Sequence, residues 1–173
     1  MKNVLVGDVI SFSGSGFACS KSKLVEVGLL HLRPFNISNN GELTLKEKYF
    51  VPQSEAPINC QQLNEGDILF NNTNSVELVG KAALIRDPIV AGYSNHLTRI
   101  SVDDKVILPT YFMYWLLYMK STGYFSSQAT QWVSQAAYKV SDLKLLSIPL
   151  PDLDVQNEIV QNLEAISKVI SNR

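Results

Sequence analysis

The sequence LNEGDILFNNTNSVELVGKAALIR, residues 63–86, decides the fold because two apolar runs in it flank a polar loop. Residues 68–70 and 82–85 are short, apolar runs, so both are predicted to be buried strands. The five residues after the first run carry amide or hydroxyl side chains, which favour turns by bonding to nearby backbone. They are Asn71, Asn72, Thr73, Asn74 and Ser75. The stretch therefore predicts two strands joined by an ordered polar loop.

Helix signals lie inside the same loop. Asn74 followed by Glu77 has the spacing of a capping box, and Gly80 is placed to end a single helical turn in the left-handed conformation. A helix N-terminus with free N–H groups, next to amides and Lys81, suits an anion such as a phosphate. The alternative is a tight polar loop that only caps a hairpin or a β-bulge.

The segment GDILFNNTNSVELVGKAAL, residues 66–84, resembles the core signature of target recognition domains in the specificity subunits of type I restriction-modification enzymes. Three other segments resemble the same family in the same order. They are LRPFNI at residues 32–37 with Gly41, NHLTRI at residues 95–100, and IPLP at residues 148–151 followed by Gln156, Ile159 and Val160. The resemblance covers nearly the whole chain.

This resemblance implies an α/β (α+β) fold, with a mixed, partly barrel-like sheet and packed helices in a target recognition domain at residues 1–151. A protruding C-terminal coiled-coil helix is expected at residues 152–173. The implied function is to bind double-stranded DNA and direct the methyltransferase (modification) and restriction subunits to a target sequence. The resemblance implies neither catalysis by this chain nor a cofactor or metal.

Length and composition fit a small globular domain. The chain has 173 residues, 46% of them apolar, which is enough for one core. Its longest apolar run, residues 111–119, is far short of the roughly 20 residues that span a membrane, and the N-terminus has no signal-peptide pattern. Cys19 and Cys60 lack metal-site spacing, so we expect reduced thiols in a cytoplasmic protein, with a disulfide between them as the alternative.

Net charge does not indicate a DNA-binding protein by itself. The chain has 15 basic and 16 acidic residues. Residues 1–151 carry a net charge of +1, and residues 152–173 carry −2. DNA affinity would therefore need a local basic face, or a partner that supplies the non-specific electrostatic attraction.

The candidate DNA contacts lie in polar loops at the ends of apolar strands, where rigid scaffolds present binding groups. One loop is residues 71–75, and the other contains Tyr93, Asn95 and His96. Lys81 and Arg99 are the expected phosphate contacts. Further contacts are expected from Lys21, Lys23, Gln128, Gln131 and Lys139. For His96 the alternative is a structural, hydrogen-bonded histidine.

The flanking segments are predicted to support these loops. Residues 42–51 alternate well enough for a partly exposed strand, and Pro109 suits the first position of a helix with a broad apolar stripe. Residues 124–138, which include Trp132 and Gln135, are polar enough to lie on the surface. The two prolines of residues 148–151 predict extended, irregular backbone.

Catalytic motifs are missing from the sequence. It has no phosphate-binding G-x-x-x-x-G-K-S/T loop, no serine elbow and no H-E-x-x-H. Residues 12–16, FSGSG, match the F-x-G-x-G loop with which adenine methyltransferases approach S-adenosylmethionine, but the chain lacks the Pro-Pro motif that should accompany it. DNA recognition without chemistry is the preferred function, and a protein-interaction adaptor built on the C-terminal helix is the alternative.

The tail is expected to associate with another helix. Ile159, Leu163, Ile166 and Ile170 are spaced 4, 3 and 4 residues apart, as in a coiled-coil seam. In the resembled family, two recognition domains are separated by such helices. The chain is therefore either a half-size subunit that forms a homodimer or a fragment whose helix continues. The target DNA sequence does not follow from the residues.

Overall fold

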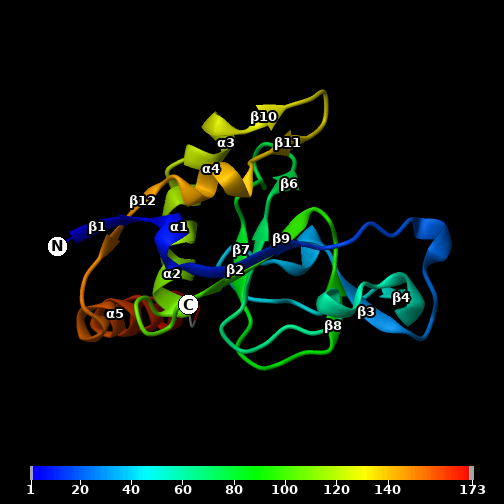
Figure 1. The fold of residues 1–173 in the computed structure, drawn as a ribbon, viewed down its shortest axis with the longest axis horizontal. Coiled ribbons are helices and arrows are strands. Elements are labelled where there is room, and N and C mark those ends of the chain that lie inside the picture. The colour runs from blue at the N-terminus through cyan, green and yellow to red at the C-terminus, as the bar shows by residue number, and fades with distance from the viewer. Residues whose placement is uncertain (1, 172–173) are drawn as a thin grey trace.

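The computed structural model describes residues 2–171, apart from the side chains of Ile170 and Ser171. A four-stranded antiparallel sheet lies at the centre (Figure 1). Its strands follow the order β2 (Ile10–Ser15), β9 (Leu97–Val102), β5 (Ile68–Asn71) and β7 (Ala82–Leu84). Segments from three distant parts of the chain therefore meet in one sheet.

The stretch at residues 63–86 forms the inner part of this sheet. Strand β5 pairs with β7 on one side and with β9 on the other, so Ile68 lies opposite both Leu84 and Ile100. Every residue of β5 and β7 is buried. The prediction of two buried strands that flank a polar loop is confirmed.

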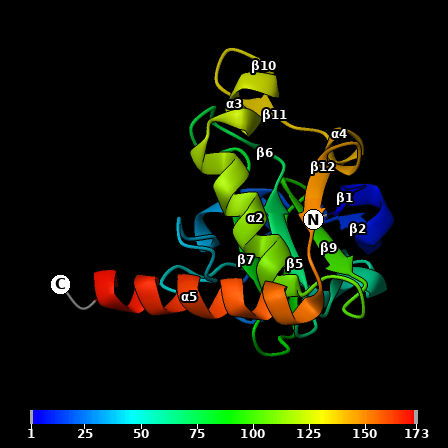
Figure 2. The same cartoon turned by 90° about the vertical axis from the view of Figure 1, so that its left-hand side faces the viewer.

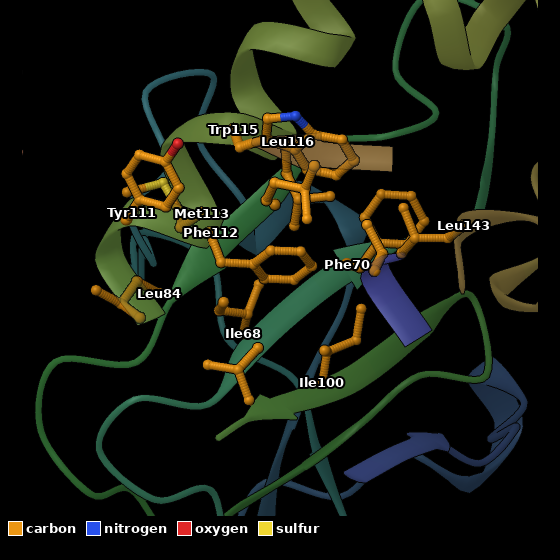
Figure 3. Close-up of a cluster of buried hydrophobic side chains, with 14 of the residues drawn as sticks. Ile68, Phe70, Leu84, Ile100, Tyr111, Phe112, Met113, Trp115, Leu116 and Leu143 are labelled. Carbon is orange, nitrogen blue, oxygen red and sulfur yellow. The ribbon is translucent and has the colours of Figure 1, made fainter. Parts of the chain in front are cut away.

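Helix α2 (Pro109–Ser121) covers one face of the sheet (Figure 3). Pro109 occupies the first turn, where its missing N–H costs no hydrogen bond. Phe112 and Leu116 have no exposed surface and pack in the same cluster as Phe70. The predicted helix and its apolar stripe are confirmed.

Three smaller sheets are attached to the central sheet within residues 2–171. The first contains, in order, β10 (Thr130–Gln131), β11 (Ala136–Ala137) and β6 (Thr73–Asn74). The second contains β4 (Phe50–Val51), β3 (Leu29–Leu32) and β8 (Ala91–Tyr93). The third pairs β1 (Lys2–Leu5) with β12 (Ser147–Leu150). None of these sheets closes on itself. The α/β class is confirmed, but the sheets are open and do not form a barrel.

Short helices connect the strands. They are α1 (Val6–Val9), α3 (Tyr124–Gln128) and α4 (Val140–Lys144), with 3-10 turns η1 (Lys21–Lys23), η2 (Pro34–Asn36), η3 (Gln53–Glu55) and η4 (Ile58–Cys60).

Two predictions of local structure were wrong. Residues 147–150 form the regular strand β12, with Pro149 opposite Asn3, because a two-stranded ribbon has free outer edges where a missing N–H is tolerated. In residues 42–51 only Phe50–Val51 are in a ladder. The buried side chain of Asn36 instead binds the carbonyls of Thr44 and Glu47, both at 2.9 Å, which holds this segment as a loop.

Helix α5 (Leu153–Ser171) follows β12 and packs on α2 (Figure 2). Val160 is 8% exposed and Ile159 is partly buried in the central core. Residues beyond Ser171, which the predicted helix included, lie outside the described part of the chain. Glu164 in the second half of α5 forms an ion pair with Arg86 at 3.4 Å, and the C-terminal end of the helix projects past the body (Figure 2).

Candidate nucleic-acid interface

The polar loop after β5 is ordered by its own side chains. Asn71 is fully buried, donates to the carbonyls of Thr73 (2.9 Å) and His96 (3.2 Å), and accepts from Nδ2 of Asn74 (2.7 Å). Oδ1 of Asn74 in turn accepts from the N–H of Ser75 at 2.8 Å. The amide of Asn71 is therefore used inside the fold and closed to solvent.

The predicted capping box is not formed. Asn74 belongs to strand β6, and residues 76–80 are a turn that lacks a regular helix. Glu77 bonds to its own backbone N–H and to Ser75, which lowers the pKa of its carboxyl group. Gly80 does adopt the predicted left-handed conformation, at φ +86°. No helix N-terminus exists here to hold an anion, so the hairpin-loop alternative describes this stretch correctly.

A second tight turn lies against this loop. The N–H of Leu97 donates to the carbonyl of Ser94 at 2.8 Å, which leaves Asn95 exposed and His96 partly exposed at the tip. The carbonyl of His96 accepts from the N–H groups of Asn72 (3.1 Å) and Thr73 (3.3 Å). Two polar segments that are distant in sequence are thus brought together.

Tyr93 does not belong to this turn. It ends strand β8 and is 1% exposed, and its hydroxyl contacts Sγ of Cys60 (3.8 Å) and the carbonyl of Gly14 (3.3 Å). Burial raises the pKa of the Tyr93 hydroxyl. The tyrosine supports the turn from inside the core and offers no surface to a ligand.

A hairpin formed by β10 and β11 stands beside the loop. Ala136 pairs with Asn74 and Ala137 with Thr73, so the hairpin extends the short strand β6 into a three-stranded sheet. Gln128 and Gln131 are exposed on this segment, as predicted from its polar composition, and Lys139 is exposed just after it. The hairpin and the two polar turns form one continuous region.

We call this region the hairpin end, defined as residues 72–80, 95–96 and 124–139. It lies opposite α5 in both Figure 1 and Figure 2. Aromatic rings fix its base: Phe125 lies 5.0 Å from Tyr138 and 5.3 Å from Phe70, measured between ring centroids. The side chains at the hairpin end are therefore carried on a rigid support.

Lysines lie on and beside the hairpin end: Lys139 belongs to it, and Lys81 and Lys120 flank it in the sequence. Between Asp104 and Asp142 the sequence has no acidic residue but contains Lys120 and Lys139. Lys81 is 8% exposed, and among the described residues it has no ion-pair partner. Burial, and then the charge of Lys120, lower the pKa of Lys81. Two lysines near each other without a carboxylate partner favour an anion beside them.

Arg99 lies elsewhere, in the middle of the central sheet. It stands opposite Leu69, its Nη1 donates to the carbonyl of Gln62 (3.1 Å), and its guanidinium lies 4.3 Å from the centroid of the Phe12 ring. Its Nε is buried and has no hydrogen-bond partner within the described residues. Internal contacts therefore occupy much of this guanidinium.

Lys21 and Lys23 lie on η1, beside the β3–β4–β8 sheet and away from the hairpin (Figure 1). Lys23 forms an ion pair with Glu55 at 2.8 Å, which offsets its charge. The structure thus brings residues 72–75, Asn95, His96, Gln128, Gln131 and Lys139 together, and leaves the two η1 lysines and Arg99 outside this group.

Two residues, Trp132 at the hairpin end and Lys120 beside it, were missing from the predicted contact set. Trp132 was placed on the surface but not among the contacts, and Lys120 was not singled out at all. The absence of acidic residues between Asp104 and Asp142 was the sequence signal that connects them.

The fold and the sequence both match one family. A family model described as the type I restriction modification DNA specificity domain matches residues 1–173. The chain belongs to this family. It is 28% identical over 164 residues to the putative type I restriction enzyme MjaX specificity subunit of Methanocaldococcus jannaschii. It is 25% identical over 129 residues to the type I restriction enzyme EcoBI specificity subunit of Escherichia coli.

Solved structures of the family share the fold. The HsdS subunit from Thermoanaerobacter tengcongensis matches 99% of this chain with a TM-score of 0.67 and 20% identity. A structure described as the basis of "complex assembly and conformational transition of the type I R-M system" matches 99% with a TM-score of 0.73 and 20% identity. These alignments cover 38% and 39% of those chains. The resemblance inferred from the four sequence segments is confirmed.

The chain spans only part of the length of these proteins. The aligned region covers 94% of this chain but 38% of the MjaX subunit, and 74% of this chain but 26% of the EcoBI subunit. The chain thus spans less than two-fifths of the length of either of these two relatives.

The described residues contain no group of three or more His, Cys, Asp or Glu side chains placed to hold a metal ion. None of their helices combines the length and apolar character needed to cross a bilayer.

Proposed function

We propose that this chain binds a short sequence in double-stranded DNA, as a recognition domain of a type I restriction-modification specificity subunit. The observation that carries the proposal is the hairpin end, where amides from three separate segments meet on a rigid support, with Lys139 on it and Lys81 and Lys120 beside it. Lysines supply attraction to phosphates, and amides distinguish base edges in the major groove.

The contacts divide by exposure. Gln128, Gln131 and Asn95 are exposed and suit base edges, whereas Lys139 and the Lys81–Lys120 pair suit phosphates. Thr73, Ser75 and His96 are partly exposed between these groups and complete the proposed surface. Asn71 and Tyr93 act from inside the fold, since neither side chain reaches solvent.

The role proposed for the chain is recognition rather than catalysis. In the complete system, a methyltransferase subunit and a restriction subunit would be directed to the DNA sequence that this domain binds. The near-neutral charge of residues 1–151 favours help from such a partner in binding DNA tightly.

The test begins with selection of bound duplexes from a random-sequence pool, with and without the methyltransferase subunit. Fluorescence anisotropy then measures the affinity for the selected duplex at about 50 and 200 mM salt. Gln131→Ala is expected to relax specificity at one position by roughly 1–3 kcal/mol. Lys139→Ala is expected to weaken binding to all sequences and to reduce the salt slope by about 1.

Lys46→Ala is the matched control, because Lys46 is exposed on the loop before β4, outside the hairpin end. Recovery of no preferred sequence with either protein preparation would overturn the proposal. Affinity that is independent of salt would instead favour the adaptor function built on α5.

We also propose that the second half of α5 pairs with another helix in antiparallel orientation. Leu163, Ile166 and Val169 are 37%, 56% and 60% exposed, whereas Val160 is 8% exposed against the body. Ile159 packs partly on the core, and the side chain of Ile170 lies outside the described residues. The free seam is therefore shorter than the predicted one and begins at Leu163.

A weak homodimer is expected, because the seam spans so few turns. A two-fold pair would read two inverted half-sites. Sedimentation equilibrium over a concentration series tests this, with Leu163→Lys and Ile166→Lys combined in one variant. The control variant combines Asn157→Lys with Gln161→Lys, which adds the same charge at exposed positions of α5 outside the seam. A dimer that is equally stable after Leu163→Lys and Ile166→Lys, or a wild-type chain that stays monomeric, would contradict the proposed pairing through α5.

A further inference from the structure

The tip of the β10–β11 hairpin exposes two large apolar side chains. Trp132 is 59% exposed, and Val133 is fully exposed. The N–H of Trp132 donates to the carbonyl of Gln135 at 2.7 Å, which closes a tight turn. An indole held in water on such a turn loses the benefit of burial, so its position needs an explanation other than stability of the fold.

The base of the hairpin is fixed, although its tip is exposed. Ala136 has no exposed surface and pairs with Asn74, and the N–H of Tyr138 donates to the carbonyl of Asn72 at 2.9 Å. The Tyr138 ring is 3% exposed and packs on Phe125 at 5.0 Å. The tip is therefore presented by a rigid arm, in contrast to a mobile loop.

The surroundings of the tip indicate its partner. Gln131, Ser134 and Gln135 next to the indole are exposed, uncharged hydrogen-bonding residues. The nearest charges along the chain are Lys120 and Lys139, and the sequence has no acidic residue between Asp104 and Asp142. An apolar tip ringed by amides and hydroxyls, with lysines as the nearest charges along the chain, is complementary to stacked bases flanked by phosphates.

We propose that the Trp132–Val133 tip is a wedge that enters the duplex and stacks its indole against a base at a partly opened step. This inference rests on the proposed function and adds a residue that deforms the DNA rather than reading a base edge. Pyrimidine–purine steps are the easiest to unstack, so the wedge adds a preference for such a step within the target.

The test uses the selected duplex with 2-aminopurine placed at successive positions, since this base brightens when it unstacks. The wild-type chain is expected to raise the fluorescence at one step. Trp132→Ala is expected to abolish that signal and to weaken binding about tenfold or more, which is the scale of one base–aromatic stack. Trp132→Phe is expected to retain most of the 2-aminopurine signal and most of the affinity, because it keeps an aromatic face.

The chain contains two tryptophans, and Trp115 is 9% exposed in the core, so the intrinsic fluorescence offers a second readout. Duplex binding is expected to quench the Trp132 emission, and this quenching is expected to disappear in Trp132→Phe. Ile58→Ala is the control for loss of an exposed apolar side chain, since Ile58 is 90% exposed on η4, away from the hairpin. Thermal unfolding of each variant shows whether its fold is intact.

Failure of this inference is distinct from failure of the proposed function. If the wild-type chain binds no DNA, the proposed function itself is wrong. If the wild type binds and Gln131→Ala changes its specificity while Trp132→Ala leaves affinity and 2-aminopurine unchanged, only the wedge is overturned. Loss of methyltransferase-subunit binding in Trp132→Ala, with DNA binding intact, would also overturn it by showing that the tip is a protein contact.

Discussion

The N–H of Leu108 donates a hydrogen bond to Oε1 of Gln156 at 2.8 Å, which ties α5 to the residue before α2. Nε2 of the same amide donates to the carbonyls of Pro151 (2.8 Å) and Val106 (3.1 Å). Gln156 has no exposed surface, so three backbone groups depend on one buried side chain. The angle at which α5 leaves the body is fixed by this amide as well as by the packing of Val160.

Replacement of Gln156 by Leu is expected to destabilise the chain by roughly 2–4 kcal/mol, because it leaves buried backbone groups without partners. Urea denaturation measures this change. Gln161→Leu is the matched control, since Gln161 lies exposed on the same helix. An equal effect of the two substitutions would show that the three hydrogen bonds contribute nothing net.

Replacement of Gly80 by Ala is expected to be more costly than replacement of Gly123. Both glycines have positive φ, +86° and +76°, so each Ala should cost about 1–2 kcal/mol in backbone strain. A Cβ on Gly80 would also overlap the Phe125 ring, whereas the nearest atom to a Cβ on Gly123 is Oγ of Ser126 at 3.8 Å. Overpacking should therefore add about 1–3 kcal/mol at Gly80 alone.

Thermal unfolding of the two variants measures this difference. Equal losses of stability would mean that the Phe125 ring moves freely, and would argue against a rigid support for the hairpin.

Replacement of Lys81 by Met is expected to stabilise the free chain and to weaken DNA binding. Burial lowers the pKa of Lys81, so the unfolded state holds its proton more readily and the charged lysine destabilises the fold at neutral pH. Methionine removes this charge and keeps the stem. Thermal unfolding and anisotropy measure the two effects, and Lys46→Met is the control. If the Lys81→Met variant were less stable than the wild type, the buried charge of Lys81 would not be a source of instability.

Stability is expected to fall as the pH drops below about 6.5, the ordinary pKa of histidine. Burial lowers the pKa of His31, so below 6.5 the unfolded state binds a proton that the folded state does not. Nδ1 of His31 accepts from Nε of Arg33 at 3.4 Å, and its Nε2 lies 3.2 Å from the carbonyl of Phe17, which suits the neutral ring.

Urea titrations between about pH 5 and 7.5 test this dependence. His31→Gln is expected to flatten the decline, and His96→Gln serves as the control at the other histidine of the chain. If the loss of stability at low pH were unchanged in His31→Gln, other titrating groups would be its cause.

Local patterns in the sequence predicted the elements whose residues carry their own signal. Residues 68–70 and 82–85 contain uninterrupted apolar side chains, and they became β5 and β7. Pro109 preceded an apolar stripe, and it begins α2. Four short segments in the right order were enough to predict the family, which the match over residues 1–173 confirms.

Elements whose hydrogen bonds come from distant residues were mispredicted. Pro149 is in a strand because Asn3 lies opposite it, and residues 42–49 are a loop because Asn36 binds their carbonyls. The polar loop has no capping box because Asn74 pairs with Ala136 in the short sheet of β6 and β11. In each case the competing partner is set by the tertiary fold.

The sequence by itself determined the central strands, the helix over them and the amphipathic tail, because burial of apolar side chains follows from their spacing along the chain. Only the tertiary structure decided which polar residues face outward together. Asn71 and Gln131 are both amides in polar segments, yet one is sealed by the turn at His96 and the other stands exposed on a hairpin. Hydrogen-bonding capacity is a property of the residue, but its availability depends on which backbone groups the fold places beside it.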